Sequence, residues 1–307
     1  MRNIGIDISK KTIDVFFQAE VYATFPNTKK GFTALAKKLF TDDILGVEST
    51  GIYHHDLALF FIQKGIEVRE LNPIMTKQFI RSTVRKKKTD KSDAKIISLL
   101  LAQGEGYPMK EEKINNPLQK ILRVKRKLIQ MKTSLILQEQ TLKKEKDFSL
   151  IRKSLKSLIK SYDTQIRNLK TEALKFQDDS AKILESIPGI SPNIAREILG
   201  EIGDSSRFKK KKEIIAYAGY DPKLKQSGTS IYVTGKLTKR GSPYLRNALY
   251  TASFANMRSN TVFSRYYNKK KDEGKHHYQA MTATSRKMLE IIFSLLRKKE
   301  EFSLVFS

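Results

Sequence analysis

The sequence "NIGIDISKKTIDVFFQAEVYATFP", residues 3–26, contains three short apolar segments separated by polar breaks. Segments of this length that are rich in Ile, Val and Phe are typical of β-strands, and short polar breaks between them favour hairpins. Asp7 interrupts the first apolar segment. The sequence therefore predicts a three-stranded antiparallel meander that carries a carboxylate in the middle of its first strand.

The residues that follow the meander alternate between helix and strand patterns. A helix can begin at Asn27 or Thr28, the buried strand "ILGVES" contains Glu48 near its end, and the helix "YHHDLALFFIQK" precedes the strand "IEVREL". Pro73 opens a further helix, and "TDKSDAKIISLLLAQ" forms the last one. A meander followed by alternating helix and strand is typical of a ribonuclease-H-type α/β layer fold, which we expect over residues 1–108.

Four carboxylates are expected to meet in this fold. Its first strand is central, the strand with Glu48 lies beside it, and the last helix packs over the ends of both. Asp90 and Asp93, spaced i and i+3, share one face of that helix. Carboxylates so close together repel unless divalent cations neutralise them. The sequence therefore predicts a Mg²⁺ site, with Mn²⁺ as a possible substitute, formed by Asp7, Glu48, Asp90 and Asp93.

The two helix acids also fit ordinary structural roles. Asp90 is typical of a first-turn helix acid, and Asp93 of a partner for a neighbouring lysine. The strand positions of Asp7 and Glu48, in the required order, favour the metal site.

Several other residues compete for a place in the site. We expect Asp14 and Glu70 to face solvent or a basic neighbour. His54 and His55 are more typical of an ordinary helix pair or a phosphate contact than of a metal site. The chain has no cysteine, which excludes disulfides and thiolate zinc sites.

The chain is strongly basic, with 59 Lys and Arg against 32 Asp and Glu and a formal net charge of +27. Such a charge attracts phosphate polyanions. The sequence contains no apolar segment near the ~20 residues that a spanning helix needs, and its first residues do not resemble a secretory leader, so we expect a soluble, intracellular protein. The residues predicted to contact nucleic acid lie in two segments, namely Arg81, Arg85, Lys86, Lys87, Lys88 and Lys91, and Lys236, Lys239, Arg240 and Arg246.

Residues 109–183 have the composition of long, Lys-rich helices. Two apolar stripes indicate an antiparallel helix pair, which serves either as a coiled coil favouring at least a dimer or as a plain spacer. The stripes are Leu128, Met131, Leu135 and Leu142, and then Ile151, Leu155, Leu158, Tyr162 and Leu169, with Gln165 as an interruption.

Residues 184–307 are predicted to be mostly helical. The segment "LESIPGISPNIAREILGEIG" is typical of a helix-hairpin-helix, which can hold a phosphate, or of an ordinary connection between helices. Ser227, in "KQSGTS", lies between a basic segment and a glycine, where it is either a hydroxyl presented to a phosphate or a plain turn residue.

These motifs resemble those of the DEDD-type transposases of the insertion sequence 110 family. The resemblance rests on "GIDISK", "GVESTG", "NP" at 72 and 73, and "KTDKSDA", followed in the same order by "ESIPGI", "IAYAGYDP", "QSG" and "KLTKRGSPYLRNALY". It implies a RuvC-like domain whose four acids bind Mg²⁺, a coiled-coil insertion used in assembly, and a C-terminal transposase domain with a nucleophilic serine. By motif position that serine is Ser227, with Ser230 and Ser242 as competitors.

The resemblance also implies a mechanism and partners. Members of the family exchange strands of donor and target DNA through a covalent phosphoserine intermediate, as multimers that combine one protomer's acids with another's serine. A noncoding bridge RNA pairs with both DNAs. The implied protein is a cytoplasmic, nucleoid-associated homo-oligomer, either a dimer or a tetramer.

Two other functions remain compatible with the sequence. One is a metal-dependent endonuclease of the Holliday-junction type, in which water attacks and Ser227 only lines the DNA. The other is a non-catalytic RNA or DNA scaffold built on the basic helices.

Overall fold

The structure, a computed structural model, describes residues 1–48, 53–82, 90–143, 148–176, 178–227, 230–239 and 241–303. Within these ranges, the side chains that it does not describe include those of Arg81, Asp90, Lys91, Ser227 and Lys236. The chain divides into two compact units, unit 1 (Met1–Asn115) and unit 2 (Asn116–Ser307). Each unit has a hydrophobic core of its own.

Unit 1 combines one mixed β-sheet with helices. Its elements are, in chain order, β1 (Asn3–Ile8), β2 (Thr12–Phe16), β3 (Tyr22–Pro26), α1 (Lys29–Ala36), β4 (Ile44–Glu48), α2 (His55–Ile62), β5 (Glu67–Leu71), α3 (Pro73–Ser82), α4 (Asp90–Ala102), β6 (Tyr107–Pro108) and α5 (Glu111–Ile114). The described strands form a six-stranded sheet in the order β3-β2-β1-β4-β5-β6. The first three strands are antiparallel to one another, and β4 and β5 continue the sheet parallel to β1. The predicted meander and the mixed α/β class are confirmed.

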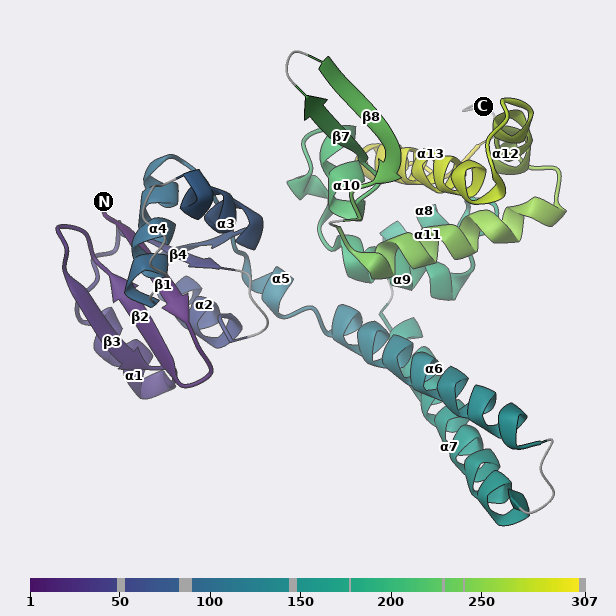
Figure 1. Cartoon of the computed structure of the whole chain (residues 1–307), viewed down its shortest axis with the longest axis horizontal. Coiled ribbons are helices and arrows are strands. Elements are labelled where there is room, and N and C mark those ends of the chain that lie inside the picture. The colour runs from purple at the N-terminus through teal and green to yellow at the C-terminus, as the bar shows by residue number, and fades with distance from the viewer. Residues whose placement is uncertain are drawn as a thin grey trace. The chain divides into compact units, whose positions relative to one another are not determined.

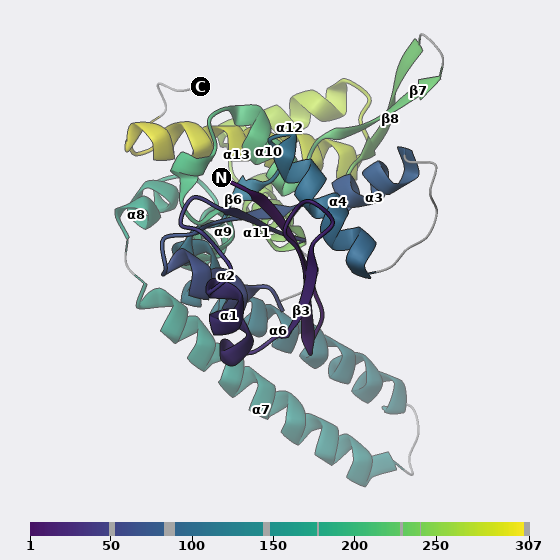
Figure 2. The same ribbon diagram turned by 90° about the vertical axis from the view of Figure 1, so that its left-hand side faces the viewer.

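Helices cover both faces of this sheet (Figure 1 and Figure 2). On one face, Ile4 and Ile6 of β1 belong to a core that also contains Phe32 of α1 and Phe61 of α2. On the other face, a smaller core joins strand residues to α4, which lies beside α3. The alternation of side chains along β1 therefore directs Ile4 and Ile6 toward α1 and α2, and Gly5 and Asp7 toward α4.

Helix α4 lies directly on the backbone of β1 at Gly5. A Cβ atom on Gly5 would lie 1.9 Å from the carbonyl oxygen of Ala94 and 2.6 Å from the amide nitrogen of Ser98. The Ser98 Oγ donates a hydrogen bond of 2.6 Å to the Asn3 carbonyl. Because Ser98 lies over Asn3 while Ala94 lies over Gly5, α4 runs antiparallel to β1.

We expect Gly5→Ala to destabilise unit 1 by about 3 kcal/mol, because the added methyl group meets backbone atoms that cannot move without shifting α4. The matched variant is Gly46→Ala, for which the three atoms nearest to the added Cβ belong to side chains, the first being Leu101 Cδ1 at 2.6 Å. It should cost about 1 kcal/mol, because side chains can adjust. Urea denaturation of both variants checks the order, and equal losses would contradict the backbone contact.

Unit 2 is mostly helical, as predicted. Its elements are α6 (Pro117–Leu142), α7 (Ser149–Leu174), α8 (Asp179–Glu185), α9 (Pro192–Ile202), the 3₁₀ helix η2 (Ser205–Arg207), α10 (Lys211–Ala218), β7 (Pro222–Ser227), β8 (Ser230–Leu237), α11 (Pro243–Ala255), the 3₁₀ helix η3 (Asn256–Arg258), α12 (Val262–Asp272) and α13 (His277–Lys298). Apolar side chains of α9, α10, α11 and α13 form its core. No helix in the described ranges of either unit is long and apolar enough to cross a membrane.

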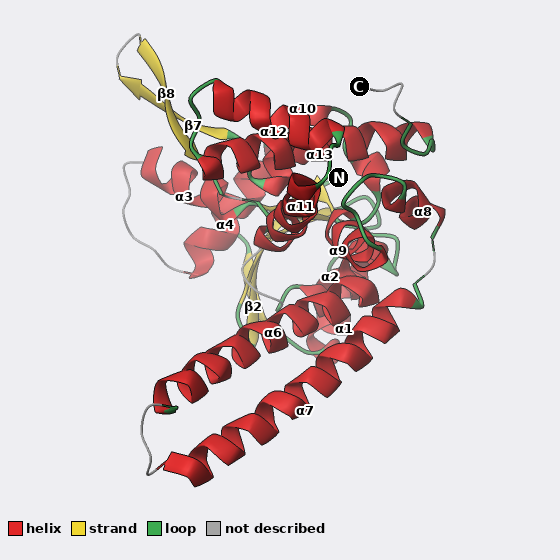
Figure 3. Cartoon of the chain, turned by 90° about the vertical axis from the view of Figure 1, so that its right-hand side faces the viewer, coloured by secondary structure: helices red, strands yellow, loops and turns green. Residues whose placement is uncertain are grey.

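Helices α6 and α7 lie side by side and run antiparallel (Figure 3). Lys132 of α6 pairs with Asp163 of α7 at 2.6 Å, and Glu139 of α6 pairs with Arg152 of α7 at 3.0 Å. Residue numbers therefore rise along α6 where they fall along α7, as in antiparallel helices. The predicted stripe on α7 divides between two sides. Its half-buried members are accompanied by two isoleucines that the predicted spacing omitted, whereas Ile151 and Leu158 are exposed. The half-buried apolar residues of α7 are Leu155, Ile159, Tyr162, Ile166, Leu169 and Leu174.

The turn between α8 and α9 is packed inside unit 2. A Cβ atom on Gly189, where φ is 82°, would lie 2.1 Å from Asn256 Nδ2. Asn256 Nδ2 also donates a hydrogen bond of 2.8 Å to the Pro188 carbonyl. These contacts give the "PGI" turn a structural task against α11, as in an ordinary connection between helices.

Candidate active site

Asp7 and Glu48 lie at neighbouring positions on one face of the sheet. β1 and β4 are parallel, with Gly5 beside Gly46 and Ile6 beside Val47, so the next position places Asp7 beside Glu48. Because side chains alternate along a strand, both acids share the face of Gly5 and Gly46, which α4 covers. Both are half-buried.

The first turn of α4 lies at the level of these two acids. Ala94 contacts Gly5, and one helical turn back from Ala94 is Asp90, a displacement of ~6 Å. The two-residue step from Gly5 to Asp7 along β1 is about 6.6 Å in the same direction. The backbone of Asp90 therefore begins α4 near the level of Asp7, and the half-buried Asp93 lies in the same turn.

Thr76 of α3 holds the carboxylate of Glu48. The Thr76 side chain is 4% exposed, and its Oγ1 lies 2.8 Å from Glu48 Oε2, to which it donates a hydrogen bond. The same Oγ1 lies 3.0 Å from the Pro73 carbonyl. The sequence pattern did not indicate Thr76, because only the packing of α3 brings it to a residue that lies 28 positions earlier in the chain.

Two competing acids have other surroundings. Asp14 is paired directly opposite Asp7 in the β1–β2 ladder, so it shares the face of Asp7, which the sequence did not reveal. Its carboxylate accepts a hydrogen bond of 2.5 Å from Thr24. Glu70 alternates with Leu71 and so points to the opposite face, where its Oε1 lies 3.9 Å from Nε2 of the buried His54.

The side-chain oxygens at the ends of the central strands β1 and β4 are of the type that binds a hard divalent cation. Asp7, Glu48 and Asp93 supply carboxylate oxygens, which Mg²⁺ prefers. The hydrogen bond from Thr76 occupies one oxygen of Glu48 and fixes its orientation. The structure does not bring Asp7, Glu48 and Asp93 close enough together to hold a metal ion, because no three described His, Asp or Glu side chains are grouped in that way. The side chain of Asp90 lies outside the described set.

We expect Thr76→Val to weaken Mn²⁺ binding about 10-fold, because outer hydrogen-bond partners of a ligand typically contribute 10- to 100-fold to metal affinity. Titration with Mn²⁺, followed by the electron paramagnetic resonance of the free ion, measures this. Thr76→Ser keeps the hydroxyl and should bind Mn²⁺ nearly as the parent protein does. Equal affinity in the valine and serine variants would contradict the role of the hydroxyl.

Ser227 is the last residue of β7, and its register partner is Ser230, the first residue of β8. The hairpin begins where Pro222 faces Leu237, which packs against the core of unit 2. Its far end extends away from the helices (Figure 1). The structure therefore places Ser227 and Ser230 at the tip of a projecting hairpin.

Ser242 has a different setting. It is the N-cap of α11, its Oγ accepts a hydrogen bond of 3.2 Å from the Leu245 amide, and it donates one of 2.8 Å to Glu201 Oε2. Glu201 is 4% exposed and is also bound by Arg123, whose Nε and Nη2 donate at 2.8 and 3.0 Å. The hydrogen bonds from Arg123 to Glu201 raise the pKa of Arg123. Ser242 is therefore tied into a structural network that joins α6, α9 and α11.

The predicted nucleic-acid contacts are only partly within the described residues. Arg85, Lys86, Lys87, Lys88 and Arg240 lie outside them, and Arg81, Lys91 and Lys236 are described by their backbone alone. Lys239 is exposed and has a φ of 53°.

Arg246, the remaining member of that set, points into unit 2. Its Nη1 donates hydrogen bonds to the Ala218 and Gly241 carbonyls at 2.8 and 2.9 Å. Burial lowers the pKa of Arg246. Through these hydrogen bonds Arg246 stabilises the segment that precedes α11.

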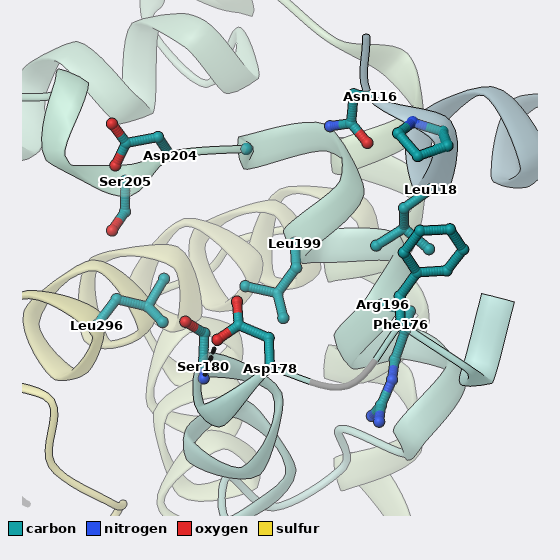
Figure 4. Close-up of a pocket in the computed structure, with 12 residues that line it drawn as sticks. Asn116, Leu118, Phe176, Asp178, Ser180, Arg196, Leu199, Asp204, Ser205 and Leu296 are labelled. Carbon is teal, nitrogen blue, oxygen red and sulfur yellow. Dashed lines mark hydrogen bonds between the residues drawn. The ribbon is translucent and has the colours of Figure 1, made fainter. Parts of the chain in front are cut away.

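A cavity of about 420 Å³ lies in unit 2 near the bases of α6 and α7 (Figure 4). Figure 4 shows the Asp178 carboxylate turned toward Ser180, whose amide donates to it at 3.0 Å. Asp204 similarly accepts from the amide and hydroxyl of Ser206, at 2.8 and 2.6 Å. Because these carboxylates cap the starts of short helices, the cavity does not gather a set of catalytic groups.

Two family profiles match the chain. A profile described as "Transposase", for the DEDD domain of IS110 elements, matches residues 4–144, and one described as "Transposase IS116/IS110/IS902 family" matches residues 181–268. The first includes Asp7, Glu48, Asp90 and Asp93, and the second includes Ser227.

Curated relatives agree with these profiles. The pilin gene-inverting protein of Moraxella bovis is 29% identical over 312 residues, which cover 97% of this chain and 97% of the relative. The corresponding protein of Moraxella lacunata is 29% identical over 315 residues, again with 97% of each chain covered. The insertion element IS110 uncharacterized 43.6 kDa protein of Streptomyces coelicolor is 33% identical over 116 residues, which cover 38% of this chain and 28% of the relative.

Proposed function

Because the chain belongs to the IS116/IS110/IS902 family of transposases, we propose that it exchanges DNA strands by using four acids of unit 1 and a serine of unit 2. Membership of the family makes the protein a DNA transposase or recombinase with DNA as its substrate. The mechanism, the choice of residues and the partners given below are proposals.

The position of α4 along β1 is the observation that supports assigning the four acids to one site. Asp7 and Glu48 occupy adjacent positions on the face that α4 covers, and α4 begins at Asp90 near the level of Asp7. The strand order and the helix that crosses the central strand are what a ribonuclease-H-like or RuvC-like domain requires, and the DEDD family profile supports this assignment. We assign residues 1–108 to that domain, 109–183 to a coiled-coil insertion and 184–307 to the C-terminal transposase domain.

Asp7, Glu48, Asp90 and Asp93 would hold Mg²⁺, for which Mn²⁺ can substitute. When bound, the ion would stabilise the negative charge that develops on the phosphate during cleavage. Thr76 keeps the Glu48 carboxylate in its orientation. The basic segment around residues 81–91 attracts the DNA backbone to this edge of the sheet.

Ser227 is the proposed nucleophile. Its position at the end of β7 presents it at the tip of the hairpin, whereas the hydroxyl of Ser242 is engaged by Glu201 and the Leu245 amide. In the reaction, the serine oxygen forms a bond to phosphorus and loses its proton, while one deoxyribose oxygen leaves and takes up a proton. The phosphoserine ester keeps the phosphate activated, so the hydroxyl of another DNA end can displace the serine and complete the exchange.

Assembly and guidance belong to the same proposal. The acids and Ser227 lie in different units of the chain, which is compatible with active sites that combine two protomers. Exposed apolar residues on the helix pair, among them Leu137, Ile151 and Leu158, favour association into a homodimer or tetramer. The net charge of +27 suits a protein that holds both DNA and a noncoding bridge RNA.

We expect a covalent protein–DNA adduct when the protein is mixed with its flanking noncoding RNA, Mg²⁺ and end-labelled donor and target DNA, then denatured and resolved by electrophoresis. Ser227→Ala should abolish the adduct, because it removes the attacking oxygen. Ser230→Ala, the register partner at the same hairpin tip, should retain it. Asp7→Asn should abolish both the adduct and cleavage.

Two outcomes would contradict this mechanism. Cleaved DNA without an adduct, equal in the parent and Ser227→Ala proteins, would indicate a junction endonuclease that uses water. Full strand exchange by Asp7→Asn would remove the acids from the mechanism.

A further inference from the structure

The turn between α12 and α13 presents a basic and aromatic surface that the proposed chemistry does not use. The segment "RYYNKKKDEGKHHY", residues 265–278, carries five Lys and Arg against two acids. We call this surface the α12–α13 patch and define it by Tyr267, Lys271, His277 and Tyr278. Lys271 follows Tyr267 by four residues and so lies on the same face of α12. Within the patch, Lys271, His277 and Tyr278 are exposed, and Tyr267 is half-buried.

Three rings of the patch are in contact with one another. The Tyr267 hydroxyl lies 2.8 Å from His277 Nδ1, and the two ring centroids are 5.8 Å apart. The rings of His277 and Tyr278 are 5.3 Å apart. The Tyr278 side chain is 74% exposed at the end of this row. The fold thus holds His277 in place and leaves a large ring beside it in solvent.

The positive charge of the patch comes from Lys271, because Glu273 pairs with two other lysines of the turn. Glu273 binds Lys270 at 2.7 Å and Lys275 at 3.0 Å. The hydrogen bonds from these two lysines lower the pKa of Glu273 to about 2, so it stays ionised at neutral pH. In the described part of the chain, no ion pair joins Lys271 to an acid, so its charge is available to a phosphate backbone.

We propose that the α12–α13 patch binds a single strand of the substrate DNA, with bases stacked on Tyr278 and His277 and a phosphate contacted by Lys271. Exposed aromatic rings beside lysines are the two components of single-strand binding, because every base has a stacking face and every linkage a charge. A duplex keeps its bases stacked inside and would leave the rings unused. Strand exchange requires DNA strands to unpair, so the inference rests on the proposed function, which supplies this ligand.

The test compares two exposed tyrosines. Tyr278→Ala removes the ring of the patch, and Tyr107→Ala removes a ring of unit 1 that is 75% exposed, against 74% for Tyr278. Fluorescence anisotropy with fluorescein-labelled dT12 at fixed salt measures affinity in the full-length protein. We expect Tyr278→Ala to weaken dT12 binding at least about 5-fold, the lower range for loss of one stacked base, and Tyr107→Ala to leave it unchanged. Thermal unfolding confirms that both variants fold.

A second variant tests the phosphate contact. Lys271→Ala should reduce the slope of log K against log salt for dT12 by about 0.7, because each phosphate contact on a single strand contributes roughly that amount. Photocrosslinking to a strand with 5-bromodeoxyuridine should label Tyr278 or His277. An unchanged slope, or crosslinks confined to other residues, would overturn the placement of the strand.

The same binding measurement separates the alternatives. Equal losses by Tyr278→Ala on dT12 and on a 12-base-pair duplex would overturn the preference for a single strand. A greater loss on rU12 than on dT12 would overturn DNA as the ligand in favour of RNA. Since binding needs neither cleavage nor a metal, these results are independent of whether Ser227 and the four acids act as proposed.

Discussion

The close contact between α4 and β1 sets where two of the four proposed acids lie relative to the other two. Because residue 5 is glycine, the helix backbone can rest on the central strand, where a Cβ atom would lie 1.9 Å from the Ala94 carbonyl. This contact sets the height of α4 along the strand, and hence the height of Asp90 and Asp93 relative to Asp7. A small change in the contact would displace two acids together while leaving the other two on the sheet.

The sequence pattern predicted strands β1 to β5 of unit 1 and the position of β4 beside β1. The alternation in residues 3–26 predicted the meander, and the order of the later strands placed Glu48 beside Asp7. The bond between Thr76 and Glu48 depends on how α3 packs, and nothing in the spacing of the two residues indicates it. Likewise, Ile159 and Ile166 belong to the half-buried side of α7, whereas the predicted heptad included the exposed Ile151 and Leu158. The predicted stripe differs from the half-buried side of α7 because Leu and Ile occur at more than one helical spacing in this segment.

Unit 2 holds its candidate serines in contrasting ways. Glu201 is almost completely buried, and its oxygens are satisfied because Arg123 binds both of them and Ser242 donates a further hydrogen bond. Arg123 lies 78 positions before Glu201 and Ser242 lies 41 after it, so the network was not visible in the sequence. It anchors the start of α11 while the β7–β8 hairpin projects from the same unit. A serine on a projecting hairpin can reach a DNA backbone more readily than a half-buried cap residue whose hydroxyl is already hydrogen-bonded.

The central claim is that Asp7, Glu48, Asp90 and Asp93 form one metal site at the ends of β1 and β4. Anomalous diffraction from crystals of the full-length protein soaked in Mn²⁺ tests it most directly. The account predicts Mn²⁺ density bounded by these four carboxylates, which disappears in Asp7→Asn crystals. Mn²⁺ bound at other residues, or density that persists at full strength in Asp7→Asn, would contradict it.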